Sequence, residues 1–324
     1  MRRRKFHKTI SKAAFLAYLS PIGAFKPLKN AAPLQKGDRI RLIVPGSPIT
    51  KLQLEIALAN IRKLGLEPEY DDRVLLEYGY LAGKDDVRAN QINEALEDDK
   101  IKAIWAIRGG YGCTRILPKL NADLLRANSK PLLGYSDITA LLVFWDRYSG
   151  NLAFHAPVLK ENWNSSQLDH LEQVLFSEKV VASLGNLEVI QGNAVSVTGQ
   201  MTGGNLSVLA ALCGTDWEWN IEDKIIFLED IGEDPYRIDR MLHQLHQSTD
   251  FNQAKAILLG GFTDCTAAKE KPSFTTKETL QKFFGSLALP VWYGAPFGHI
   301  SEQIVLPVNK TVILDSKNLK WDYI

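Results

Sequence analysis

The alternation of short apolar runs with amphipathic segments is the feature that most constrains this fold. Between residues 39 and 148 of the 324-residue chain, each apolar run that is typical of a strand is followed by a segment with helical spacing. The expected strands are 39–44, 67–70, 103–107 and 131–135, and the expected helices are 52–64, 85–96, 114–120 and 138–148. Because strands joined through helices run parallel, this pattern predicts a parallel sheet covered by helices, a Rossmann-like α/β domain.

The rest of the chain predicts a second, smaller α+β domain. Residues 151–193 carry few strong signals and are interpreted as a connector, after which Gly203-Gly204-Asn205 opens a helix. Apolar strands are expected at 224–228, 256–259 and 290–293, with a helix over 235–246. The expected division is a signal or disordered segment over 1–32, the Rossmann-like domain over 33–160, a linker over 161–195 and the C-terminal domain over 196–324.

Composition excludes several classes of protein and site. A net charge of +1, without a dense Lys/Arg patch after the first residues, argues against nucleic-acid binding. The three cysteines form neither a disulfide framework nor a paired metal-ligand motif. The histidines also lack metal-ligand spacing, among them His155, His243 and His246. We therefore expect neither a metal nor a cofactor.

The first residues are typical of an export signal. Residues 2–8 are basic and include Arg3-Arg4, and residues 13–19 are mildly apolar, the order found in secretory and twin-arginine signals. The apolar run is too short to span a bilayer, so no stable membrane insertion is expected. We expect an exported, periplasmic protein; the alternative is a cytoplasmic protein with a basic tail.

A glycine-rich turn follows the expected strand 103–107. Its sequence is Arg108-Gly109-Gly110-Tyr111-Gly112, and Cys113 lies between this turn and the expected helix 114–120. A side chain at such a strand-to-helix turn can act as a nucleophile beside free backbone N–H groups, and the helix dipole lowers the pKa of a thiol there. The alternative is a connecting or phosphate-binding turn with Cys113 as an apolar filler. Dinucleotide binding is less favoured, because the turn lacks the G-x-G-x-x-G spacing.

Five stretches in unbroken order resemble the LD-carboxypeptidase family: IRGGYGCTRILPKL (107–120), LLGYSDITAL (132–141), GGNLSVLAALCGT (203–215), IIFLEDIGEDPYRIDRML (225–242) and GAPFGH (294–299). The resemblance implies a Rossmann-like N-terminal domain, a β-rich swivelling C-terminal domain and an active site between them. It also implies a metal-independent hydrolase that removes the terminal D-amino acid, typically D-alanine, from peptidoglycan tetrapeptides through a covalent acyl-enzyme. The family is often dimeric, so a homodimer is one state that the resemblance allows.

The resemblance further implies a triad of nucleophile, acid and histidine. His299 corresponds to the histidine of the PFGH motif, and Glu229 to the acid, with Glu233 as the second choice. We expect the nucleophile, serine in this family, to follow the glycine-rich turn, where this chain has Cys113. The alternatives are Thr114 as the nucleophile, or an inactive protein that binds peptides on the same scaffold.

Other expected site residues surround this triad. Gly109, Gly110 and Thr114 are candidate backbone donors to an oxyanion. Arg108 and Arg237 are candidates for binding a substrate carboxylate, although arginine is more often a surface residue. Ser136 and Asp137 follow the next strand and are expected to support the turn, with Asp137 preferred as the N-cap of the following helix.

Overall fold

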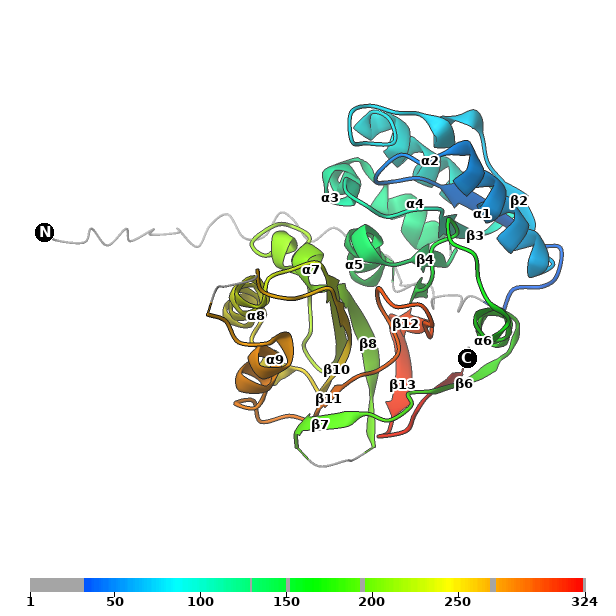
Figure 1. Cartoon of the computed structure of the whole chain (residues 1–324). Coiled ribbons are helices and arrows are strands. Elements are labelled where there is room, and N and C mark those ends of the chain that lie inside the picture. The colour runs from blue at the N-terminus through cyan, green and yellow to red at the C-terminus, as the bar shows by residue number, and fades with distance from the viewer. Residues whose placement is uncertain (1–31, 129, 150–151, 193–195, 269–271, 323–324) are drawn as a thin grey trace, which may run out of the picture.

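The computed structural model describes residues 32–128, 130–149, 152–192, 196–268 and 272–322. The expected export signal falls within residues 1–31, outside the described residues. Two sheets, each with helices packed against it, form two adjoining halves of the molecule (Figure 1). In the described residues, no helix has both the length and the apolar character needed to cross a membrane.

The first sheet has the strand order β12-β5-β4-β3-β1-β2. Its strands are β1 (Arg39–Ile43), β2 (Glu67–Glu69), β3 (Ile101–Ala106), β4 (Leu132–Gly134), β5 (Ala153–His155) and β12 (Leu306–Val308). All neighbouring strands pair in parallel except β12, which lies antiparallel to β5. The carboxyl ends of β1, β3, β4 and β5 therefore lie along one edge of the sheet, where α/β proteins bind ligands.

The helices of this half are α1 (Lys51–Lys63), α2 (Asp85–Glu97), α3 (Cys113–Ile116), α4 (Ala122–Ala127), α5 (Thr139–Tyr148) and α6 (Ser165–Phe176). Helix α1 begins at a capping box between Thr50 and Gln53, which satisfies backbone N–H groups at its start. Helix α3 is shorter than the expected helix 114–120, because a 3-10 turn over Leu117–Lys119 follows it. Residues 139–145 of α5 are all buried, and this helix packs against β8 and α7 of the other half.

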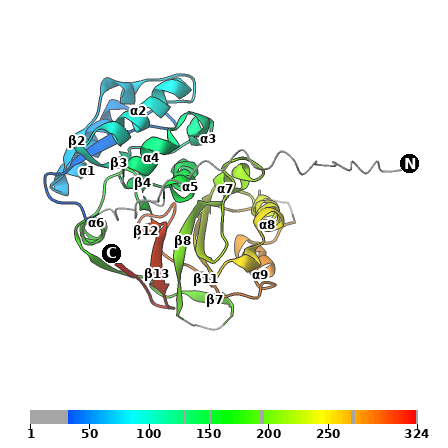
Figure 2. The same ribbon diagram turned by 180° about the vertical axis from the view of Figure 1, so that it is seen from behind.

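The second sheet has the order β6-β14-β13-β8-β9-β10-β11-β7, with a parallel centre from β8 to β11 and antiparallel strands on both sides. Its strands are β6 (Lys179–Ser183), β7 (Glu188–Gln191), β8 (Val197–Asn205), β9 (Lys224–Ile231), β10 (Ala256–Thr263), β11 (Val291–Tyr293), β13 (Lys310–Leu314) and β14 (Asn318–Asp322). Its helices are α7 (Leu206–Leu212), α8 (Pro235–Thr249) and α9 (Thr276–Phe284). Helices α8 and α9 lie together on one side of this sheet in both ribbon views (Figure 1, Figure 2).

The expected linker over 161–195 contains regular structure. It forms α6 and also β6 and β7, the two edge strands of the second sheet. Sequence reasoning missed these strands because their side chains are only partly buried, so the apolar pattern is weak. The fold class, a parallel-sheet α/β domain followed by a β-rich α+β domain, is confirmed.

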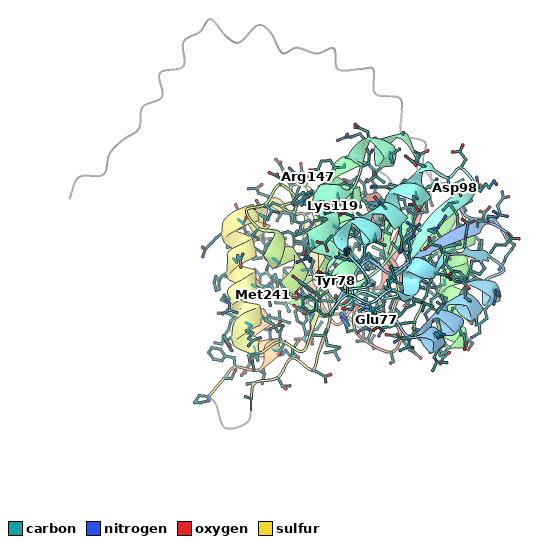
Figure 3. The ribbon with its side chains drawn as sticks, turned by 90° about the horizontal axis from the view of Figure 1, so that it is seen from above. Glu77, Tyr78, Asp98, Lys119, Arg147 and Met241 are labelled. Atoms are coloured by element: carbon teal, nitrogen blue, oxygen red, sulfur yellow. The ribbon has the colours of Figure 1, made fainter. Side chains whose placement is uncertain are left out.

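Polar contacts hold the two halves together. Lys224 of β9 forms an ion pair with Asp146 of α5 at 2.7 Å, with both side chains largely buried. Asp146 also accepts a hydrogen bond from Thr202 of β8. Arg147 follows in α5 and donates to the backbone oxygen of Glu218. The view from above labels Arg147, with Lys119 and Asp98 on the N-terminal half and Met241 on α8 (Figure 3).

Candidate active site

A sharp turn at the end of β4 holds Ser136. The strand ends at Gly134, and a 3-10 turn over Ser136–Ile138 leads into α5. Ser136 has a φ of 66°, a left-handed conformation that is uncommon for residues other than glycine. Gly134 is required at this turn because its φ is 155° and an added Cβ would lie 2.9 Å from a side-chain carbon of Ile138. This strand–turn–helix geometry is that of a nucleophile elbow.

His299 faces this serine from the C-terminal half. Its Nε2 lies 3.1 Å from Ser136 Oγ. The loop that carries it is fixed to the end of β10, because Thr263 Oγ1 donates to the His299 backbone oxygen at 2.6 Å and the Gly261 N–H donates to Phe297. The Tyr135 ring packs against the imidazole with 4.8 Å between centroids. Segments far apart in the sequence therefore supply the serine and the histidine.

Glu229 lies behind the histidine, near the end of β9, and is fully buried. Its Oε2 lies 2.7 Å from His299 Nδ1, so Nδ1–H donates to the carboxylate and Nε2 is free to accept a proton from the serine. Burial by itself raises the pKa of Glu229, but interactions with His155 and His299 outweigh it and lower this pKa to about 2. The carboxylate is therefore ionised at neutral pH.

Gly298 allows the histidine loop to approach this carboxylate. Its φ is 97°, and an added Cβ would lie 2.7 Å from the Cβ of Glu229. The structure thus brings together Glu229 and His299, as expected from the sequence. Glu233, the second choice, lies away from the imidazole contact and is 3.5 Å from Arg237 in an ion pair.

The expectation that the Cys113 thiol faces His299 is wrong. Cys113 is fully buried in the core at the start of α3, and the position that hydrogen-bonds to His299 Nε2 is occupied by Ser136. Burial, followed by the nearby Asp137 carboxylate, raises the pKa of this thiol well above its usual range, the opposite of the expected helix effect. Thr114 lies one residue further into α3, and the hydroxyl at His299 is that of Ser136.

Asp137 links the two turns. Its Oδ2 accepts a hydrogen bond of 2.9 Å from the backbone N–H of Cys113, so it caps the start of α3. The preferred expectation, an N-cap on the following helix, is wrong, because α5 begins without a side-chain cap. Asp137 instead supports the glycine-rich turn, which was the other role considered for it.

The glycine-rich turn lies directly against the serine. An added Cβ at Gly109 would lie 3.2 Å from both Ser136 Cβ and Asp137 N. Ser47, at the end of β1, fixes this turn: its N–H donates to the Gly109 oxygen and its Oγ accepts from the Tyr111 N–H. The turn therefore forms one wall beside the serine, although the nucleophile expected on it lies elsewhere.

Arg88 is a supporting residue that sequence reasoning missed. It is fully buried on α2, and its guanidinium donates to the backbone oxygens of Pro45, Gly83 and Gly112. It also forms an ion pair with Asp85. One side chain thus connects three turns beside the site. The sequence signal for this role was a charged residue on the helix face that also carries Ile92 and Leu96.

The two expected carboxylate-binding arginines lie in different environments. Arg108 is half-buried directly before Gly109, and its Nη1 donates to the Pro48 oxygen at 2.6 Å. Arg237 is exposed on α8, where it packs on Tyr236 and lies near Glu233 and Asp234.

Within the part of the chain described here, no cluster of three or more His, Cys, Asp or Glu side chains is arranged to hold a metal ion.

Models of one protein family match both halves of the chain. Residues 40–156 match the LD-carboxypeptidase N-terminal domain and residues 198–314 match the C-terminal domain. The chain belongs to the LD-carboxypeptidase family. Membership makes it a hydrolase of the carboxypeptidase class.

Relatives cover nearly the whole chain. A murein tetrapeptide carboxypeptidase from Pseudomonas aeruginosa is 34% identical, over 87% of this chain and 95% of the relative. A probable murein peptide carboxypeptidase from Bacillus subtilis is 32% identical, over 91% of this chain and 94% of the relative. The crystal structure of a muramoyltetrapeptide carboxypeptidase from Oxalobacter formigenes superposes with a TM-score of 0.77 at 30% identity, covering 88% and 98% of the two chains.

Proposed function

We propose that this chain is an LD-carboxypeptidase that removes the terminal D-amino acid from peptidoglycan-derived tetrapeptides, with Ser136 as the nucleophile. The observation that carries the proposal is the continuous hydrogen-bonded series Ser136 Oγ, His299, Glu229, with separations of 3.1 and 2.7 Å. The names of the relatives support the substrate class.

The reaction proceeds through an ester on the serine. Ser136 Oγ attacks the carbonyl carbon of the scissile amide while its proton passes to His299 Nε2, and Glu229 stabilises the imidazolium that forms. The C–N bond then breaks, and the leaving amine of the D-amino acid takes the proton from Nε2. Water next gives a proton to His299 and attacks the ester, which releases the shortened peptide and restores the serine.

Backbone N–H groups beside Ser136 stabilise the oxyanion of this reaction. The Asp137 amide follows the nucleophile directly, and the Gly109-Gly110 turn lies against the same peptide. Of these two donors, Gly109 was expected and Asp137 was not, while Thr114, the third expected donor, lies within helix α3. Arg108, directly before Gly109, is the better placed of the two arginines to bind the terminal carboxylate of the substrate.

The alternative of an inactive peptide-binding protein rested on a cysteine in place of the serine nucleophile. That reason does not apply, because the residue facing His299 is Ser136. The proposed function needs no reactive thiol.

Two matched substitutions test this assignment. Ser136→Ala should reduce kcat on an LD-linked tetrapeptide by at least about 10³-fold, because it removes the nucleophile from a coupled triad. Cys113→Ala should retain activity within about threefold, and a thiol alkylator should not inhibit the wild type, because the thiol is outside the reaction. Mass spectrometry of released D-alanine measures both. An active Ser136→Ala variant, or inhibition by the alkylator, would contradict the proposal.

A further inference from the structure

A second imidazole lies behind the Glu229 carboxylate. His155 is the last residue of β5, in the N-terminal half, and it is fully buried. Its Nε2 lies 3.9 Å from Oε1 of Glu229, the oxygen that does not contact His299. Within the described residues, neither ring nitrogen of His155 nor this Oε1 has a hydrogen-bond partner.

The surroundings of His155 otherwise suit an apolar ring. The rings of Tyr135, Phe227 and Phe297 surround it edge-on, with centroid separations of 5.6, 5.4 and 5.7 Å. Burying an imidazole without hydrogen bonds costs stability, and phenylalanine would fill the same space without that cost. Packing alone therefore does not account for a histidine here, whereas its orientation towards Glu229 does.

A carboxylate that orients a histidine needs both of its oxygens fixed. His299 fixes Oε2, but rotation about the Cγ–Cδ bond of Glu229 would carry Oε2 away from Nδ1 unless Oε1 is also held. The separation of 3.9 Å exceeds hydrogen-bond length by about 1 Å. Because β5 and β9 belong to different halves, a small closure of the two halves would complete this bond.

We propose that His155 is a positioning residue that donates its Nε2–H to Glu229 Oε1 across the boundary between the halves and so keeps the carboxylate aimed at His299. The inference rests on the proposed triad. The same hydrogen bond orients Glu229 and aligns the half that carries Ser136 with the half that carries His299.

Three substitutions at one position test this inference. His155→Phe keeps the ring and removes the donor. His155→Gln places an amide N–H where Nε2 lies, and His155→Asn places one where Nδ1 lies. We expect kcat to fall about 10- to 100-fold in His155→Phe and His155→Asn with KM within about twofold, the range found when outer hydrogen-bond partners of metal-binding side chains are removed. His155→Gln should stay within about fivefold of the wild type.

A second readout separates this inference from the proposed function. A fluorophosphonate that labels Ser136 reports the reactivity of the triad without any peptide, and its labelling rate should fall by the same factors as kcat. Wild-type kcat and labelling rate in His155→Phe would overturn the inference, as would equal losses in the Gln and Asn variants. If the wild type is labelled but cleaves no LD-linked peptide, the substrate assignment fails, and the labelling rates still decide the role of His155.

Discussion

At the residue scale, the site depends on three side chains whose environments differ sharply. Ser136 is partly exposed on a left-handed turn, His299 is mostly buried, and Glu229 is fully buried yet ionised. The neighbouring imidazoles keep the buried Glu229 carboxylate ionised, so its charge depends on the geometry of the site.

Glu229→Gln should reduce kcat by about 10³- to 10⁴-fold, because the amide no longer stabilises the imidazolium or fixes its tautomer. The substitution should also change the pH dependence of stability. The pKa of Glu229 in the folded protein, about 2, lies below its unfolded value, so its stabilising contribution is present above about pH 4.3 and is lost as pH falls towards 2.

The measurement is the difference in Tm between pH 7 and pH 3, which should be smaller in Glu229→Gln than in the wild type. Glu233→Gln is the matched control, because that carboxylate lies outside the triad. An unchanged pH dependence in the Glu229 variant would contradict the low pKa.

At the residue scale, sequence reasoning predicted the acid and the histidine of the triad but not the nucleophile. Glu229 and His299 were predicted from the resemblance to the LD-carboxypeptidase family, whose motifs match the stretches 225–242 and 294–299 that contain them. Cys113 and Ser136 both follow a glycine at a strand-to-helix turn, so local sequence does not separate them. The two residues are distinguished by which turn contacts His299. For Ser136 this contact joins residues that are 163 positions apart in the sequence. The available signal was Gly134-Tyr135-Ser136, a G-x-S sequence between a strand and a helix.

At the element scale, helix α2 stabilises the turns beside the site through one side chain. Arg88 binds carbonyl oxygens of three separate turns, including Pro45 before the Ser47 turn and Gly112 in the glycine-rich turn. An added Cβ at Gly112 would lie 2.7 Å from the Arg88 guanidinium, so the guanidinium can occupy this position only because residue 112 is glycine.

Arg88→Met should lower the free energy of unfolding by about 3 kcal/mol, because it removes the donor to buried carbonyl oxygens and one of the two arginine partners of Asp85. It should also lower kcat, since the turn beside Ser136 loses its support. Urea unfolding and the tetrapeptide assay measure the two effects. Arg115→Met is the control: Arg115 pairs with the same Asp85 from an exposed position, and its loss should cost less than about 1 kcal/mol. Equal effects of the two substitutions would contradict this role.

The strong periodic elements were predictable at this scale, and the weak ones were not. Strands β1 to β4 and helices α1, α2 and α5 lie within a few residues of their expected bounds, whereas β5 and β12 of the first sheet were not expected. Strands β6, β7 and β14 lie at or near sheet edges, with alternating exposed residues and no strong run of apolar side chains. Their place in the sheet comes from pairing with distant strands, which the sequence pattern does not contain.

At the scale of the whole molecule, the alignment of two halves decides whether the triad forms. Ser136 belongs to one half, and Glu229 and His299 to the other. The buried Asp146–Lys224 pair joins α5, which begins just after the Ser136 turn, to β9, which carries Glu229. A change at this pair should therefore affect both stability and activity.

Asp146→Ala should lower the free energy of unfolding by about 3 kcal/mol, because Lys224 then remains largely buried without its counter-charge. It should lower kcat as well, through misalignment of Ser136 and His299. Asp123→Ala removes an exposed ion pair with Arg126 in the same half and should change stability by less than about 0.5 kcal/mol. Chemical unfolding and the peptide assay distinguish the two variants, and an Asp146→Ala protein with wild-type kcat would contradict the proposed coupling.

The late position of strand β12 in the sequence has a consequence for biosynthesis. Residues 306–308 return from the second half to pair with β5, so the first sheet acquires this strand only after β6 to β11 of the second half have been synthesised. A nascent chain that has just emerged through β11 carries Ser136 without His299 and leaves one side of β5 unpaired. The hydrolase can therefore begin to cut only after translation has passed His299.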